Sequence, residues 1–232
     1  MALSADGAIL VAGEPGYDTW KGGVRVYDWN DAEYVARAPI LDNTNGILDD
    51  SFGWTVALSH DGNTVAIGSP YNDPGGVVDA GHVRVFAWGD ASWNQLGTDF
   101  VGTSASAHTG CSVALSSDGT VLAVGGSSET VDGDYARGTV RVHVWEGGVW
   151  NRRGLDLEGD AANDHYGWAV ALSDDGSVLA VGAKTGTVAS GAGYGFVRVH
   201  AWDGDNGAWT TRGSDMEAED YNDQMGLSLI HI

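Results

Sequence analysis

The feature that most constrains this chain is a segment that occurs four times along its length. "VALSHDGNTVAIG" at Val56–Gly68 returns as "VALSSDGTVLAVG" at Val113–Gly125 and as "VALSDDGSVLAVG" at Val170–Gly182, and a fourth copy opens the chain at Ala2–Gly13. The Asp of the shared Asp-Gly pair stands at positions 6, 61, 118 and 175, in steps of 55, 57 and 57 residues. A fixed period of this length is the signature of a repeat architecture.

Other landmarks keep the same period, so one continuous array accounts for almost the whole chain. A Val-Arg-Val triplet recurs in each copy, and a Trp stands three residues after each triplet. The copies are predicted to cover residues 2–56, 57–113, 114–170 and 171–226.

Within one copy the pattern predicts four strands. In the second copy they are expected at Gly53–Ser59, Thr64–Gly68, His82–Trp88 and Trp93–Gly97, with a hairpin turn at Asp61-Gly62 between the first two. Nothing in the copy has helical period, and 36 glycines make helices unfavourable. Each copy is therefore predicted to be a four-stranded antiparallel meander.

Such a meander is apolar on both faces, because Val83 and Val85 point to one side and Phe86 and Trp88 to the other. Both faces need covering, and neighbouring copies provide the cover if they stack radially as the blades of a β-propeller. The predicted fold class is all-β, a propeller with four visible blades of about 57 residues. A β-solenoid is the alternative, although Asp-Gly hairpins argue against its parallel coils.

The formal net charge of −21 makes nucleic acid an improbable partner, since phosphate binding needs a basic patch. No apolar run approaches the ~20 residues of a membrane helix, so no membrane insertion is expected. Cys111 is the lone cysteine and is expected in the core. The seven histidines form no metal-like cluster and are expected to be surface or core residues. No catalytic triad or acid pair stands out.

Acidic residues gather in the long loops. Of 32 acids, 20 lie between the second and third strands of a copy or between one copy and the next, and both sets of loops leave from one face of a propeller. We call it the long-loop face. Long loops on a rigid scaffold often bind partners, although a solvated acidic rim is an equally good reading. The candidate partner-binding residues are Trp20, Asp73, Asp79, Asp132, Asp134, Asp160, Asp164, Asp220 and Asp223. Trp20 is included because the other nine Trp occupy repeated positions expected to pack inside.

One arginine stands at the centre of every third strand. These are Arg25, Arg84, Arg141 and Arg198. An anion-binding ring is one reading of the pattern. The favoured reading is structural, with each guanidinium held between blades and paired with a carboxylate, because an unpaired buried charge is costly.

The pattern resembles FG-GAP-type repeats, the blades of integrin-α-like propellers. Phe52-Gly53 matches the "FG", with Thr109-Gly110, Tyr166-Gly167 and Met225-Gly226 as variants, and Gly68-Ser69-Pro70 matches the "GAP". Calcium-binding members carry a long acidic loop between the first two strands. Here that loop is reduced to a short turn such as "SHDGNT", which cannot supply the six to eight oxygens of a calcium site. No cofactor is therefore expected, apart from weak and non-specific binding of divalent cations.

The resemblance and the long loops together predict a non-catalytic recognition or scaffold propeller that binds a protein or glycan through its long-loop face. A propeller enzyme that acts on polysaccharide with loop carboxylates is the alternative. An extracellular or cell-surface location follows from the resemblance alone.

The ends of the chain depart from the repeat. After Gly226 the sequence reads "LSLIHI", where the repeat predicts "WTVALS", and Met1 stands where the other copies have Val. The hexapeptide matches the translation of a transposon end used in preparing sequencing libraries, so residues 227–232 are expected to be a non-native tail. The chain is accordingly expected to be a fragment of a larger propeller.

Overall fold

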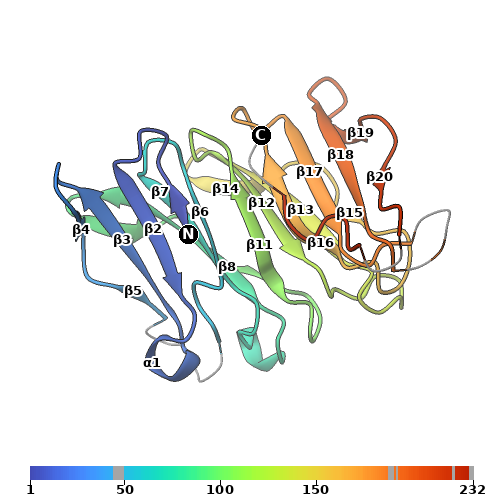
Figure 1. The fold of residues 1–232 in the computed structure, drawn as a ribbon, viewed down its shortest axis with the longest axis horizontal. Helices are drawn as coiled ribbons and strands as arrows, with labels where there is room; N and C mark the ends of the chain where they lie inside the picture. The colour runs from blue at the N-terminus through green and yellow to red at the C-terminus, as the bar shows by residue number, and fades with distance from the viewer. Residues whose placement is uncertain (44–49, 188–190, 192, 221–222, 230–232) are drawn as a thin grey trace.

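The computed structural model describes residues 1–43, 50–187, 191, 193–220 and 223–229 (Figure 1). Four antiparallel sheets lie side by side in an arc, with the first and the fourth at its opposite ends (Figure 1). The sheets follow one another in chain order and do not close into a ring. The all-β propeller architecture predicted from the repeat is confirmed.

Each sheet is one blade and has five strands. The first blade contains β1 (Ala2–Leu3), β2 (Ile9–Glu14), β3 (Gly23–Trp29), β4 (Tyr34–Ala36) and β5 (Leu41–Asp42). The second contains β6 (Thr55–Leu58), β7 (Thr64–Ser69), β8 (His82–Gly89), β9 (Ser92–Gln95) and β10 (Phe100–Val101). The third contains β11 (Thr109–Leu115), β12 (Val121–Gly126), β13 (Thr139–Glu146), β14 (Val149–Arg152) and β15 (Leu157–Glu158). The fourth contains β16 (Tyr166–Leu172), β17 (Val178–Ala183), β18 (Phe196–Asp203), β19 (Ala208–Thr211) and β20 (Met216–Glu217).

The first four strands of each blade form the predicted meander, and the short fifth strand was not predicted. It pairs with the beginning of the third strand, as Phe100 does with Val83 in the second blade. Two residues carry too little periodicity to be recognised as a strand. The only helical segments among the described residues are α1 (Tyr17–Trp20) and the 3₁₀ turn η1 (Pro74–Gly76).

The Asp-Gly turns are held by the same side-chain bonds in every blade. In the second blade the Ser59 hydroxyl donates to the Asp61 carboxylate (2.6 Å), and that carboxylate accepts the Asn63 amide (2.9 Å). The Thr64 amide then donates to the Ser59 hydroxyl (2.9 Å). The repeated Ser and Asp are therefore turn-forming residues, which agrees with the reading of these loops as turns.

Glycines let neighbouring blades approach closely where two successive sheets pack face to face. We call each such contact between sheets a joint. Gly68 lies in β7 of the second blade, and a Cβ added to it would lie 2.1 Å from the carbonyl oxygen of Gly110 in the third. Gly110 itself has a φ of +88°, which favours glycine. The same approach joins Gly13 to Gly53, Gly125 to Gly167 and Gly182 to Gly226. The "FG" and "GAP" glycines thus meet across a joint.

The hydrophobic core consists of three clusters, one in each joint. Val11 and Val24 of the first blade pack against Val65 and Ile67 of the second, and all four are fully buried. The second cluster joins the second and third blades, and the third cluster joins the third and fourth. Burial therefore takes place between sheets, as expected for blades that are apolar on both faces.

The structure follows the repeat as far as Leu227. The Leu227 amide donates to the Gln224 carbonyl (3.0 Å), as the Trp54 amide does to Ser51 and the Trp168 amide to His165. Part of the expected tail, residues 230–232, lies outside the described residues. No helix in the described part of the chain has the length and apolarity needed to cross a bilayer.

Three third-strand histidines are buried inside the blades. Burial is the main cause that lowers the pKa of His82 to about 4, of His143 to about 3 and of His200 to about 4, and the neighbouring arginines add to it. The three imidazoles are therefore neutral in the folded protein at neutral pH.

These histidines predict a loss of stability in mild acid. An unfolded His takes up a proton near pH 6.5, whereas the folded one takes it up only near pH 3 to 4. The free energy of unfolding should therefore fall as the pH drops from about 6.5 towards 4, by up to ~1.4 kcal/mol per pH unit for each His. Urea denaturation across this range measures the slope. His143→Phe should reduce it by about one proton, and an unchanged slope would show that His143 does not contribute.

Candidate functional site

The first strands of the blades line a channel at the inner edge of the arc. A cavity of about 400 Å³ lies between them, and its walls include Val56, Val113 and Val170 with the neighbouring Ala and Leu residues. The described side chains of this wall are mostly aliphatic, with His60 as a polar member and without a carboxylate. Any polar chemistry has to come from the rim of the channel.

A second cavity of about 300 Å³ forms the mouth of this channel on the long-loop face. It is lined by the residues that directly follow the "FG" glycines, namely Trp54, Cys111, Trp168 and Leu227. The Trp54 side chain is 47% exposed. Burial raises the pKa of the Cys111 thiol, so this cysteine is a poor nucleophile. We call this cavity and the side chains next to it the channel mouth.

Two histidines stand beside the mouth in equivalent positions of the repeat. Nδ1 of His108 lies 3.1 Å from the Ser128 hydroxyl, and Nδ1 of His165 lies 2.7 Å from the Thr185 hydroxyl. Both backbones have positive φ, at 53° and 54°. Non-glycine residues rarely adopt this conformation, but the equivalent residues of the other copies share it, so it belongs to the repeat and not to the histidines alone. The third strands do not contain these histidines, so they are separate from the buried ones.

The hydrogen bonds of His165 settle which ring nitrogen carries the proton. Nδ1 also lies 3.1 Å from the Asn163 carbonyl oxygen, which can only accept a hydrogen bond. The Thr185 hydroxyl donates its own proton to the same carbonyl (2.7 Å) and so must accept from Nδ1. The proton is therefore on Nδ1, and Nε2 has a free lone pair. Burial, and then Lys184, lower the pKa of His165 despite the opposing Asn163 carbonyl, which keeps the ring neutral.

Aromatic rings continue from Trp54 to the first of these histidines. The Tyr71 ring meets Trp54 edge-on at 5.4 Å and His108 at 5.3 Å. On the opposite side, Nζ of Lys184 lies 3.3 Å from the centre of the Trp168 ring. The mouth thus combines the exposed Trp54 ring with two neutral imidazoles and one lysine, in a protein whose loops are otherwise acidic.

The candidate acids of the long loops occupy several environments. Asp132 and Asp134 are exposed, and Asp132 makes only a 3.5 Å contact to Arg137. Asp220 and Asp223 are exposed as well, and the Asp223 carboxylate accepts the Asp220 amide (3.2 Å). The Asp73 carboxylate accepts the Asp79 amide (2.8 Å), and both residues are half-buried. The structure does not bring these acids together into a single site.

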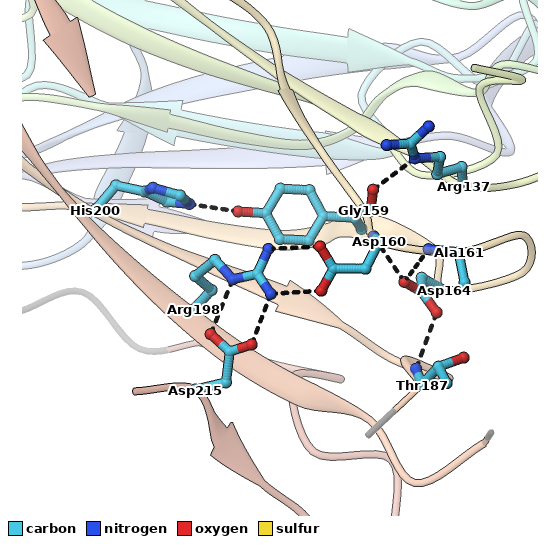
Figure 2. A network of polar contacts seen from close by, with 10 residues as sticks. Arg137, Gly159, Asp160, Ala161, Asp164, Thr187, Arg198, His200 and Asp215 are labelled. Atoms are coloured by element: carbon cyan, nitrogen blue, oxygen red, sulfur yellow. Dashed lines mark hydrogen bonds and ion pairs between the residues drawn. The ribbon is translucent and has the colours of Figure 1, made fainter. Parts of the chain in front are cut away.

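Asp160 and Asp164 belong to a joint between blades, as Figure 2 shows. Asp160 holds the Arg198 guanidinium in a bidentate pair at 2.6 and 3.2 Å. Asp164 has no exposed surface, and its carboxylate accepts the amides of Asp160, Ala161 and Thr187. The prediction that Asp164 contacts a partner is therefore wrong, because the carboxylate is used inside the loop.

The third-strand arginines each have carboxylate partners. Arg198 lies between Asp160 and Asp215 over the Tyr166 ring, and the Tyr166 hydroxyl contacts His200 (Figure 2). Arg141 pairs with Glu129 (2.7 Å) and Asp156 (2.8 Å). Arg84 pairs with Asp99 and Arg25 with Glu14. A free anion-binding ring would need guanidinium groups without such partners.

The tryptophans differ in part from the sequence prediction. Trp20 is 54% exposed, on the turn α1 of the long-loop face. Trp29 and Trp54 were expected to pack inside but are 45% and 47% exposed. Trp29 lies on the open face of the first blade, where no preceding blade covers it, and Trp54 lies at the channel mouth. The repeated position alone did not distinguish a buried Trp from an exposed one.

Sequence reasoning missed His108 and His165, which it classed as surface or core residues. The available signal was their place two residues before the "FG" glycine, where the other copies have Ser51 and Gln224. Their ring contacts depend on loops of the same blade and, for His108, of the preceding one, and could not be read from spacing. Among the described residues, no group of three or more His, Cys, Asp or Glu side chains is arranged to hold a metal ion.

A model of the FG-GAP repeat matches residues 43–86. No curated protein matches the chain. A Bacteroides uniformis protein provisionally assigned as a 6-phosphogluconolactonase superposes with a TM-score of 0.62 and 14% identity, over 97% of this chain and 55% of that one. Hydrazine synthase of Kuenenia stuttgartiensis gives 0.54 and 13%, over 93% and 47%. The chain thus spans about half the length of these two structures, and the similarity shows a shared fold.

The expectation that the chain is not an enzyme needs correction. The Bacteroides uniformis protein carries an enzyme assignment on this same architecture. A propeller of this kind therefore gives no reason to exclude catalysis.

The arginine pairs predict a graded effect of mutation on stability. Glu129 is 3% exposed, and Arg141→Ala would leave its carboxylate buried without a cation, so the free energy of unfolding should fall by roughly 3–5 kcal/mol. Arg25→Ala is the matched control, because the pair of Arg25 with Glu14 is 39% and 37% exposed and should contribute at most ~1 kcal/mol. Urea denaturation measures both, and equal losses would contradict the buried-pair interpretation.

Proposed function

Because the chain is an array of FG-GAP-type β-propeller blades, we propose that it recognises carbohydrate at the channel mouth of its long-loop face. The observation that carries the proposal is the exposed Trp54 ring, which the half-buried Tyr71 meets edge-on, beside a cavity of about 300 Å³. Aromatic faces give a flat apolar surface against which a sugar ring stacks, and neighbouring polar groups then select its hydroxyls. The place of the cavity on the long-loop face and the aromatic ring beside it both support the channel mouth as the binding site.

The polar groups of the mouth suit sugar hydroxyls. His108 and His165 are neutral because burial lowers the pKa of each ring. In His165 the Nδ1 proton is already shared with Thr185 and Asn163, so Nε2 is the nitrogen that can accept a hydrogen bond from a ligand. A sugar hydroxyl can donate to it. The mouth therefore offers a hydrogen-bond acceptor without requiring a charged ligand.

The charge of the protein favours a neutral ligand. The formal net charge is −21, and exposed acids such as Asp132, Asp134 and Asp220 lie on the loops of the same face. Their field repels anions and lowers the local concentration of an anionic ligand. Uronic acids and phosphorylated sugars are therefore poor candidates, and we propose a neutral glycan in preference to the acidic sugars or to a protein partner.

Titration calorimetry with neutral oligosaccharides and their uronic acid counterparts tests this proposal. Neutral sugars should bind, and Trp54→Ala should weaken binding at least tenfold, about 1.4 kcal/mol. Trp20→Ala is the control, since Trp20 is equally exposed on the same face but remote from the cavity lining. A preference for the acidic sugars, or a loss of binding in Trp20→Ala alone, would contradict the proposal.

A second candidate, hydrolysis of a neutral sugar lactone, is favoured by the free Nε2 lone pair of His165. In this reaction Nε2 would take a proton from water as its oxygen attacks the lactone carbonyl. The ring C–O bond then breaks, and the proton passes to the leaving alkoxide. The enzyme assignment of the Bacteroides uniformis protein agrees with such chemistry on this fold, although its phosphorylated substrate does not suit the acidic loops.

A lactone assay separates the two candidates. With neutral gluconolactone, His165→Gln should lower kcat by at least about 100-fold. Because the pKa of His165 is below its usual range, wild-type activity should persist as the pH falls below about 6.5. Trp54→Ala should raise KM and leave kcat little changed. Equal rates in wild type and His165→Gln would remove hydrolysis from consideration and leave recognition as the function.

A further inference from the structure

We infer that Lys184 restricts sugar stacking at the channel mouth to the Trp54 side, because its ammonium group covers a second sugar-binding ring at Trp168. This role rests on the carbohydrate recognition proposed above and adds a specificity-determining residue to it. Two copies of the repeat present a tryptophan at the mouth, but only one of them has a cation on the ring.

Trp54 and Trp168 occupy the same position in two copies of the repeat. Each directly follows an "FG" glycine, and each lines the cavity of the channel mouth. The amide of each donates to the carbonyl three residues earlier, Trp54 to Ser51 (3.0 Å) and Trp168 to His165 (3.1 Å). The two indoles are therefore presented on the same local backbone. They differ in exposure, since Trp54 is 47% exposed and Trp168 is half-buried.

The two copies also differ at the residue that stands at the end of the "GAP" segment. In the fourth blade this residue is Lys184, which directly follows β17, and its Nζ lies 3.3 Å from the centre of the Trp168 ring. In the second blade, which contains Trp54, the equivalent residue is Pro70. An ammonium at this distance is attracted to the negative face of the indole. Proline has no charge to offer, so Trp54 lacks this cation.

The indole is the group that holds the Lys184 ammonium. The chain has two lysines, and the other one, Lys21, pairs with the Asp18 carboxylate at 3.0 Å. In the part of the chain that the structure describes, no carboxylate is in ion-pair range of Lys184. A lysine held by a ring is notable in a chain with 32 acidic residues. The contact with Trp168 therefore sets the position of this charge.

The covered face of the indole is the one turned towards the mouth. Burial lowers the pKa of Lys184, and the nearby Cys111 opposes this shift, which places the ammonium close to the thiol. Cys111 lies in the preceding blade and lines the same cavity as Trp168. The His165 ring meets Trp168 edge-on, at an interplanar angle of 86°, and leaves the indole face to the lysine.

The backbone beside Lys184 is fixed by the next residue. The Thr185 hydroxyl donates to the Asn163 carbonyl (2.7 Å) and accepts from Nδ1 of His165 (2.7 Å). The lysine side chain therefore leaves an anchored backbone next to the ring that it covers. It is built into the mouth in the same way as the histidine.

The ammonium changes what a sugar meets at each of the two rings. On Trp54 a sugar ring can stack without displacing a cation of the protein. On Trp168 it must first displace the Lys184 ammonium and give up the cation–π contact. A neutral sugar gains nothing from the charge in return. Stacking is therefore stronger on Trp54, and removal of the lysine opens the second ring.

Titration calorimetry on a Trp54→Ala chain isolates the Trp168 ring. The probe is the neutral oligosaccharide that the wild type binds most tightly. Adding Lys184→Ala should strengthen binding at least about fivefold, because the ring is then uncovered. Adding Trp168→Ala to this double variant should remove the gain. Lys184→Arg keeps a cation over the ring, and Lys21→Ala removes the other lysine, so both should leave the Kd of the Trp54→Ala chain unchanged.

A gain in affinity does not arise from misfolding, so each outcome is decisive. If the wild type binds neutral sugars through Trp54 but Lys184→Ala brings no gain, the role of Lys184 is overturned and recognition at Trp54 stands. A gain that survives Trp168→Ala would overturn it as well. So would a loss of affinity for uronic acid oligosaccharides in Lys184→Ala, because the ammonium would then serve to bind an anion. A wild type that binds no neutral oligosaccharide would contradict the proposed function itself, and the role of Lys184 with it.

Discussion

The close contact between adjacent sheets is the constraint on which this structure depends. Each blade is apolar on both faces, and the buried valines and leucines lie in joints rather than inside a single sheet. Contact at this distance is possible only where backbones meet without side chains, as Gly68 meets Gly110. Other features depend on these joints, because Arg198 pairs with Asp160 across one of them and the channel lies between the first strands of successive blades. A single blade would expose both faces to water and would be unstable alone.

The acidic character of the chain has two different uses in the structure. Part of it neutralises the arginine row, as Asp215 and Asp160 do for Arg198 and Glu129 does for Arg141. Burial works to raise the pKa of Glu129, but the bonds from Arg141 and Thr103 outweigh it and hold the pKa below its usual range. The remaining acids are exposed on the loops, where they repel anions and keep the protein in solution. A count of carboxylates by loop could not separate these uses.

The sequence was sufficient to predict the architecture because the same pattern of strands and turns occurs in it four times. The Asp-Gly turns, the alternation in the third strand and the glycine pairs all indicate one blade, and the observed strands β6 to β9 lie close to the expected ranges. The fifth strand was too short to leave a pattern. The site was harder to predict, because Trp54, Tyr71 and His108 come together through loops whose paths the period does not describe. Asp164 was misassigned because burial of a loop carboxylate has no sequence signature.

The residues on either side of the four "FG" glycines repeat in backbone conformation, while their side chains differ. Ser51, His108, His165 and Gln224 share a positive φ between 53° and 54°, and the next residues toward the mouth are Trp54, Cys111, Trp168 and Leu227. The repeat therefore fixes the backbone conformation at the rim of the channel, whereas the side chains at these positions determine its chemistry. A single codon change in one copy alters one sector of the rim and leaves the other three sectors as they were. Selectivity in such a molecule is combinatorial, and it can be evolved or engineered one sector at a time.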